Sequence, residues 1–248
     1  MGSNKYNRGT SLTKIDGSTK DWYQSVSEGG EAGYSVFNKF GHGTMTTTKG
    51  SVWEGGALYP WNATATTMTV LSDDANDTLL GTGAKQVAVT GVDANYDALS
   101  ETVDMDGTGG VTTSASFLRV NRCWVVGDQD TIGTITIENG GTVYAYIEPE
   151  HNQTLMAVYT VPNGFTGYLR YLKTSVGSGK EVSLELLVRN FGGVFRVKHH
   201  MHVYQNSYEY RFVAPEAVPG KSDIDIRGTA AVGSVDIGAT FDVLLVAD

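Results

Sequence analysis

The stretch of the chain with the greatest metal-binding potential contains His199, His200 and His202. In a strand, His200 and His202 share one face and lie about 7 Å apart. With Glu185 and Glu209 on neighbouring strands, they could bind zinc. Charged side chains that face one another across strands are typical of a solvent-exposed ladder. We therefore expect no metal at this cluster, and we expect His199, on the opposite face, to be a core residue.

Two other stretches could carry chemistry. The segment Ser72–Thr78 contains closely spaced oxygen ligands of the kind that calcium prefers. It lacks the regular spacing and the glycine of a calcium loop, so turn formation is favoured.

The single cysteine, Cys123, excludes an intrachain disulfide, and its apolar neighbours predict an inert core thiol. The sequence contains no nucleophile elbow and no zinc-protease motif, so we expect no catalytic residue, no cofactor and no enzyme activity.

Aromatic residues are spread through the polar, glycine-rich first 43 residues. Disordered tails are usually poor in aromatics, so this pattern favours an extended arm that docks on a neighbouring molecule, with a loose tail as the alternative. The predicted interface residues are Tyr6, Trp22, Tyr23, Tyr34, Phe37 and Phe40. A second aromatic group, Trp53, Tyr59 and Trp61, could form a glycan-binding surface if it is exposed.

The elements that would position these residues are strands. Apolar residues alternate through 181–189 and 195–203, and Gly192-Gly193 between them predicts a two-residue hairpin loop. Counting outward from the loop places Val188 opposite Val197 and Leu186 opposite His199, and the same register continues to Val203. Tyr208–Phe212 alternates in the same way and predicts a third strand paired with the second, completing an antiparallel meander.

Similar short alternating runs fill the rest of the chain. About seven occur in residues 44–148, enough for a small β-sandwich. Eight occur in residues 149–248, the number in a jelly roll; the last two are Val232–Ile237 and Thr240–Ala247. The sequence therefore predicts an all-β protein with an extended N-terminal arm (1–43), a β-sandwich domain (44–148) and a jelly-roll-like β-sandwich domain (149–248).

Composition restricts the partners. The 248 residues carry a net charge of −9, which argues against broad attraction to nucleic acid or to an anionic membrane. No apolar run approaches the length of a transmembrane helix, and the N-terminus lacks the apolar core of a signal peptide. We expect synthesis in a cytoplasm and no nucleic-acid or membrane partner.

Three segments resemble a largely uncharacterised family of virion structural proteins from tailed phages, including cyanophages and other marine phages. The resemblance covers about residues 50–230 and is carried by Val87–Thr102 with Gly91-Val92-Asp93-Ala94-Asn95-Tyr96, by Ser116–Arg122, and by Gln153–Pro162 together with Phe191–Val197. These motifs carry fold rather than chemistry. The resemblance implies a place in the phage particle, made in the host cytoplasm, without specifying which part.

From this we expect a non-enzymatic capsid decoration (cement) protein that docks on the shell through its N-terminal arm. The expected partners are further copies of the chain, with a trimer favoured, and the major capsid protein. The alternatives are a neck, tail or baseplate component, whose partners would be tail or neck proteins, and a glycan-binding module on a fibre.

Overall fold

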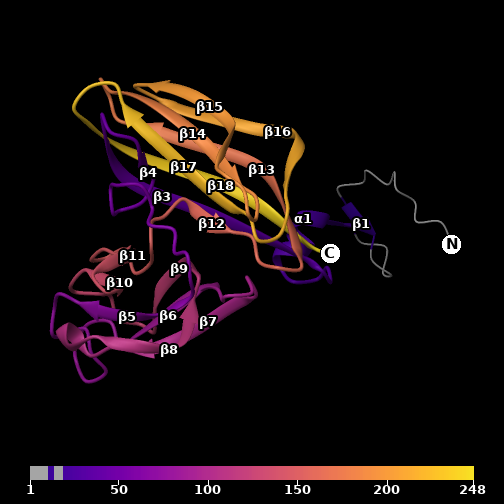
Figure 1. Cartoon of the computed structure of the whole chain (residues 1–248). Helices are drawn as coiled ribbons and strands as arrows, with labels where there is room; N and C mark the ends of the chain where they lie inside the picture. The colour runs from indigo at the N-terminus through magenta and orange to yellow at the C-terminus, as the bar shows by residue number, and fades with distance from the viewer. Residues whose placement is uncertain (1–10, 14–18) are drawn as a thin grey trace.

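The computed structural model describes residues 11–13 and 19–248. This part of the chain is almost entirely antiparallel β-sheet, as Figure 1 shows, and the predicted all-β class is confirmed. It begins with a two-stranded sheet, β1 (Ser11–Thr13) and β2 (Thr19–Asp21), followed by the short helix α1 (Trp22–Ser27). The side chain of Asp21 caps α1 by accepting a hydrogen bond from the Gln24 amide at 3.0 Å.

Eight strands form a jelly roll. One sheet has the order β16-β13-β18-β3 and the facing sheet has the order β12-β17-β14-β15. Counted along the chain, these orders are 6-3-8-1 and 2-7-4-5, the double Greek key of a jelly roll. The strands are β3 (Tyr34–Thr46), β12 (Val158–Thr160), β13 (Phe165–Val176), β14 (Glu181–Arg189), β15 (Arg196–Tyr204), β16 (Ser207–Val218), β17 (Asp223–Ala230) and β18 (Ser234–Ala247).

The second sandwich is inserted between the first and second strands of the jelly roll. After β4 (Gly50–Ser51), which pairs with β17, the chain forms two sheets with the orders β11-β10-β5-β8 and β7-β6-β9. Its elements are β5 (Thr66–Ser72), β6 (Gln86–Val92), β7 (Ala98–Asp104), a 3-10 turn (Gly107–Gly109), β8 (Val111–Phe117), β9 (Arg119–Val126), β10 (Ile135–Asn139) and β11 (Thr142–Ile147). We call this unit the inserted sandwich.

The first jelly-roll strand lies partly inside the segment predicted to be an arm. β3 pairs with β18 from Tyr34–Val246 to Thr46–Ser234, so the predicted boundary at residue 43 falls within a strand. The sequence does not reveal β3 because two of its buried positions are Gly41 and Gly43. A side chain at either glycine would collide with the backbone of residues 52, 53 or 157, so close packing requires glycine there.

The predicted strand count in residues 149–248 needs a matching correction. The runs at 232–237 and 240–247 are two parts of the single strand β18, which is 14 residues long. Glycine and alanine at 238 and 239 interrupt the apolar run and made one long strand resemble two. β3 supplies the missing eighth strand.

The register of the β14–β15 hairpin is confirmed over half of its length. Val182 pairs with Val203 and Leu186 pairs with His199, but a bulge after Leu186 then places Val188 opposite Arg196. The predicted two-residue loop is wrong. The turn spans residues 190–193 and is closed by a 2.8 Å hydrogen bond from the Gly193 amide to the carbonyl of Asn190.

The predicted meander is also wrong, because β16 pairs with β13 in the facing sheet. The chain crosses between sheets at Gln205, whose φ is 53°. Inward-facing residues alternate in the same way in either sheet, so the pattern cannot choose between them. The side chain of His199 is half-buried and faces across this edge, with Nε2 2.8 Å from the hydroxyl of Tyr208 and its ring stacked on Tyr210 at 4.3 Å.

Candidate functional site

The two sandwiches meet around Asp223 on β17. Its side chain is 3% exposed and accepts hydrogen bonds from Arg119 Nε at 3.0 Å, Arg189 Nε at 2.8 Å and Thr160 Oγ1 at 2.6 Å. Arg119 belongs to the inserted sandwich, whereas Arg189 and Thr160 belong to the jelly roll. A buried carboxylate with two guanidinium partners is charge-compensated. This network therefore joins the two units through one carboxylate.

A second contact across the same junction joins a side chain to a strand backbone. The side chain of Asn121 on β9 donates to the Thr160 carbonyl at 3.0 Å and accepts from the Thr160 amide at 2.9 Å. The buried amine of Lys39 on β3 donates to the Asn121 carbonyl. Burial, with a contribution from Arg122, lowers the pKa of Lys39 well below its ordinary value. Three separate segments are thus tied together at Asn121.

Two of the predicted interface aromatics pack within the chain at this junction. The guanidinium of Arg122 on β9 lies 4.6 Å from the ring centre of Phe37 and 5.4 Å from that of Phe40. Phe37 also stacks on Tyr159 at 4.8 Å. Because β3 is a jelly-roll strand, these side chains are half-buried and contribute to the contact between the two sandwiches.

The other described aromatics of the predicted interface lie by α1. Trp22 packs edge-to-face on Tyr23 at 4.8 Å and on Tyr34 at 5.2 Å. The guanidinium of Arg170 lies 3.7 Å from the ring centre of Tyr23. Tyr23 and Arg170 line a surface cavity of about 650 Å³ together with residues of β3, β13, β16 and β18. Tyr6 lies outside the described residues. We call Trp22, Tyr23 and Tyr34 the α1 aromatic cluster.

The structure divides the candidate metal ligands between two sheets. His200 and His202 lie on the outer face of β15, with ring centres 4.9 Å apart. Glu185 is beside them but forms an ion pair with Lys49 at 2.6 Å. Glu209 lies on β16, in the facing sheet. Among the described residues, no group of three or more metal-ligating side chains is arranged to hold a metal ion.

The acidic segment 72–78 is organised by Asp77 as a structural anchor. The buried carboxylate of Asp77 accepts hydrogen bonds from the amides of Ala84, Ile132 and Gly133 at 2.8–3.0 Å and from the hydroxyls of Ser72 and Thr131. Burial alone would raise the pKa of Asp77, but these hydrogen bonds outweigh it and lower that pKa. Protein donors therefore occupy the oxygens that a calcium ion would need, and the turn interpretation of this segment holds at Asp77.

The three aromatics of the glycan alternative do not form an exposed surface. Trp53 and Tyr59 are buried in the core of the inserted sandwich and pack on each other at 5.2 Å. Trp61 is half-buried and packs on Phe195 at 5.5 Å. Their proximity in the sequence reflects a core cluster rather than a binding platform, so this expectation is corrected.

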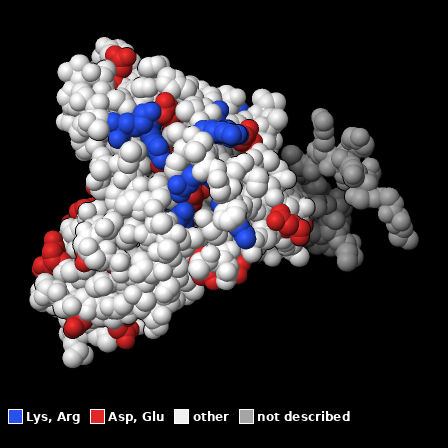
Figure 2. Space-filling model, in the orientation of Figure 1, with Lys and Arg blue, Asp and Glu red and all other residues white. Residues whose placement is uncertain are grey.

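An arginine-rich surface lies at one end of the outer face of the sheet β12-β17-β14-β15. Phe195 is sandwiched between the guanidinium groups of Arg189 at 4.5 Å and Arg227 at 4.2 Å. The loop before it exposes Phe191 by 65% and Val194 by 69%. Figure 2 shows Lys and Arg gathered over the jelly roll and at the junction, with acidic side chains on the visible face of the inserted sandwich. Arginine and aromatic side chains together are typical of protein interfaces.

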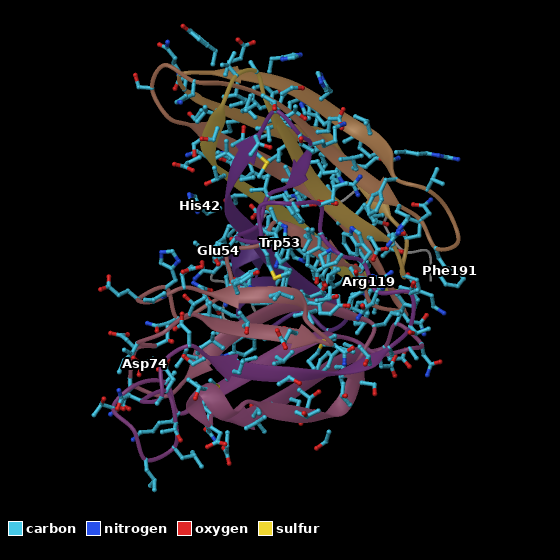
Figure 3. The ribbon with its side chains drawn as sticks, turned by 60° about the vertical axis from the view of Figure 1, so that its left-hand side comes forward. His42, Trp53, Glu54, Asp74, Arg119 and Phe191 are labelled. Atoms are coloured by element: carbon cyan, nitrogen blue, oxygen red, sulfur yellow. The ribbon has the colours of Figure 1, made fainter. Side chains whose placement is uncertain are left out.

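A small pocket lies on another side of the junction. His42, Glu54, Glu148 and His151 line this cavity of about 340 Å³, and Figure 3 labels two of them. The side chain of Glu54 is 7% exposed; Oε1 lies 3.3 Å from His151 Nδ1, and Oε2 has no hydrogen-bond partner. Burial, and then the charge of Glu148, raise the pKa of Glu54 to about 8. A pKa of about 8 favours the protonated form of this carboxyl group at neutral pH.

The lone cysteine is in the core of the inserted sandwich. Cys123 on β9 is fully buried, and burial raises the pKa of its thiol to about 12. The predicted core position is confirmed.

Sequence reasoning missed Asp223 and its arginines. Asp223 was visible only as one acidic residue alternating with Ile224 and Ile226, a pattern that many exposed strands share. Arg119 is 104 residues away in the chain, and no spacing rule links the two. In the loop at Phe191 and Val194, Gly192-Gly193 predicts a turn, and the sequence does not indicate that the two apolar side chains are exposed.

Among the residues that the structure describes, no helix is long and apolar enough to cross a membrane.

Comparison with known proteins gives little further information. No family model matches the chain, and no curated protein sequence does. Among solved structures, the chain matches that of the infectious bursal disease virus Gt strain at 11% identity and a TM-score of 0.21, covering 86% of this chain and 72% of that one. The structure of the Gx strain matches at 10% identity and a TM-score of 0.21, covering 86% and 70%. TM-scores this low do not establish a common fold, and they say nothing about function.

Proposed function

We propose that this protein is a non-enzymatic structural protein of a tailed-phage virion and that it decorates the capsid shell. The observation that carries this proposal is the complete jelly roll with a second sandwich inserted after its first strand. Jelly rolls recur in capsid proteins, although they also occur in lectins and cupins. The resemblance of residues 50–230 to phage virion proteins favours the first of these settings.

The polar residues buried in the chain support a structural role. The carboxylate of Asp223 accepts hydrogen bonds from two arginines, and that of Asp77 accepts hydrogen bonds from five donors. Both carboxylates therefore stabilise contacts between loops or between domains. The raised pKa of Cys123 keeps its thiol protonated and a poor nucleophile. The Asp223 network fixes the two sandwiches against each other and Asp77 fixes the loops of one of them, which suits a protein that has to keep its shape in a particle.

The α1 aromatic cluster is our candidate anchor on the shell. It lies where the N-terminal segment joins the jelly roll, on the outer face of the sheet β16-β13-β18-β3. Trp22 and Tyr34 remain partly exposed there, and the adjacent cavity has apolar and charged walls. Partly exposed Trp and Tyr side chains beside an arginine are the usual anchors of protein contacts.

The decisive measurement is the copy number in purified particles, from cryo-EM or from gel densitometry against the major capsid protein. A decoration protein is expected at hundreds of copies in symmetric shell positions, and shells that lack it are expected to break at a lower temperature. A few dozen copies or fewer at one vertex or along the tail would replace decoration by a neck, tail or baseplate role. Absence from the particle would overturn the proposal.

The anchor has its own test, which is co-sedimentation of recombinant protein with shells stripped of it. Trp22→Ala is expected to weaken binding at least about tenfold, the loss typical of an interface hot spot. Tyr204→Ala removes an exposed aromatic side chain from β15 in the facing sheet and is the matched control. If both variants bind like the wild type, α1 is not the anchor.

A further inference from the structure

Charge is divided unequally between the two parts of the molecule. Residues 52–157, which include the inserted sandwich, contain 14 Asp or Glu and 3 Lys or Arg, a net charge of −11. The remaining residues contain 13 acidic and 15 basic side chains, a net charge of +2. The overall charge of −9 therefore conceals an acidic unit attached to a slightly basic one.

The acidic unit ends in an apolar tip. Leu80 is 99% exposed, and its neighbour Leu79 is also exposed, as is Ile132 on a second loop. Asp77 holds the loops that carry these residues together, since it binds the amides of both Ala84 and Ile132. These loops and their neighbours also carry exposed carboxylates: Asp73, Asp106, Asp128 and Asp130. We call this group of residues the acidic tip.

The jelly roll presents a surface of the opposite kind. On the outer face of the sheet β12-β17-β14-β15, Arg189 and Arg227 flank Phe195, and the loop before it exposes Phe191 and Val194. The amine of Lys221 lies 5.6 Å from the ring centre of Phe191, which also packs on Tyr96 of the inserted sandwich at 5.6 Å. The carboxylates that pair with Arg189 and Arg227 are those of Asp223 and Asp225, and both are buried beneath the arginines. The arginines therefore cover these carboxylates, and the part of each pair that remains exposed is the cation, at 25% for Arg189 and 14% for Arg227. We call this surface the basic sheet face.

These two surfaces lie on opposite sides of the molecule. In Figure 3, Asp74, beside the acidic tip, and Phe191, in the basic sheet face, are at opposite sides of the view. The tip cannot reach the basic face of its own chain, because the Asp223 network fixes the inserted sandwich against the jelly roll. The surface that matches the basic face is therefore available only on another molecule.

We propose that copies of this chain associate head to tail, with the acidic tip of one copy against the basic sheet face of the next. Each surface has an exposed apolar residue, Leu80 on one and Phe191 on the other, and the charged side chains of the two surfaces are of opposite sign. Such complementarity steers association and fixes the orientation of the partners. A head-to-tail contact uses two different surfaces, so it closes into a ring or continues as a fibre. A ring of three would match the trimer expected from the sequence.

Sedimentation velocity of the recombinant full chain over a range of concentrations tests this. The wild type is expected to form oligomers in about 50 mM salt and to dissociate in part at about 500 mM, since salt screens the charged side chains. Leu80→Asp and Phe191→Asp are each expected to raise the dissociation constant at least about tenfold. Val213→Asp adds the same charge at a fully exposed position on β16 and should leave association unchanged.

Mixing the two defective variants distinguishes head-to-tail from face-to-face contact. A Leu80→Asp copy retains its basic face and a Phe191→Asp copy retains its tip, so an equimolar mixture is expected to form a 1:1 dimer with one intact contact. A mixture that stays monomeric would overturn the head-to-tail arrangement. A wild type that is monomeric at all concentrations, or variants that associate as well as the wild type, would overturn self-association through these surfaces. This outcome is independent of where the protein lies in a particle.

Discussion

The carboxylate of Asp223 accepts a 3.0 Å hydrogen bond from Arg119, so a buried ion pair joins residues that are 104 positions apart and belong to different sandwiches. The opposite oxygen accepts from Arg189 of the jelly roll. One carboxylate thus neutralises a cation from each unit. The contact fixes the direction in which the inserted sandwich projects, and with it the separation of the acidic tip from the basic sheet face.

We expect Asp223→Asn to destabilise the whole chain by about 3–5 kcal/mol, because it leaves two guanidinium groups without a counter-ion at a buried position. Urea unfolding at pH 7 measures this as a lower midpoint. Asp128→Asn makes the same chemical change at an exposed carboxylate and should cost less than about 0.5 kcal/mol. Equal midpoints for the two variants would show that the Asp223 network contributes no stability.

Asp77→Asn should destabilise the inserted sandwich by about 2 kcal/mol or more. Whichever oxygen is replaced by the amide nitrogen, that NH2 group would face a backbone amide that already donates to this side chain, Ala84 and Ile132 at one position or Gly133 at the other. Asp74→Asn is the matched control in the same loop, because asparagine can also accept the local turn hydrogen bond from the Asn76 amide. Urea unfolding at pH 7 compares the two variants.

The same carboxylate makes a pH prediction. The lowered pKa of Asp77 means that its stabilising effect is present above its ordinary value of 3.8 and is lost as pH falls through the lower, folded value. Asp77→Asn should therefore cost less at pH 2.5 than at pH 7. A cost that does not change with pH would mean that the hydrogen bonds do not favour the ionised form.

Much of the fold could be predicted from the sequence, because alternation of apolar residues reports which side of a strand faces inward. That signal predicts most strands of both sandwiches and the register from Val182 to Leu186. It could not say which of two facing sheets a strand joins, since both share one interior, and β16 was therefore assigned to the wrong neighbour. It also missed β3, whose inward positions include Lys39, Gly41 and Gly43 rather than large apolar residues.

The candidate surfaces were predictable only in part. Trp22 and Tyr34 stood out as aromatics in a polar segment, and the structure leaves both partly exposed. Phe37 gave the same signal, yet it packs on Tyr159 inside the chain. The acidic tip needs the loops that carry Leu80 and Ile132, far apart in the sequence, to lie together, and the hydrogen bonds of Asp77 to the amides of Ala84 and Ile132 hold them there. Contacts of this kind depend on the tertiary structure, so the local pattern of apolar and polar residues does not predict them.

Cys123 should be unreactive in the folded protein. Its thiol is fully buried and its pKa is raised to about 12, so a thiol-specific chromogenic reagent at pH 8 is expected to label it only through unfolding. Full labelling is expected within minutes in guanidinium chloride. Ser100→Cys provides an exposed thiol on β7 and should add one rapidly labelled equivalent. Rapid labelling of the wild type would show that β9 opens readily.

Glu54 should make the protein less stable as the solution becomes alkaline. Its pKa rises from an ordinary value of 4.5 to about 8 in the folded state. The folded chain therefore binds more protons than the unfolded chain between these values, and stability is full below pH 4.5 and declines as pH rises through 8.

Glu54→Gln keeps the shape and removes the charge, so its Tm should match that of the wild type near pH 5 and exceed it by at least about 3 °C at pH 8.5. Glu150→Gln, at an exposed position nearby, should leave the wild-type pH dependence unchanged. If Glu54→Gln and the wild type lose stability in parallel up to pH 8.5, then Glu54 is ionised in the folded protein, and the pocket at His42, Glu148 and His151 admits enough water to solvate it.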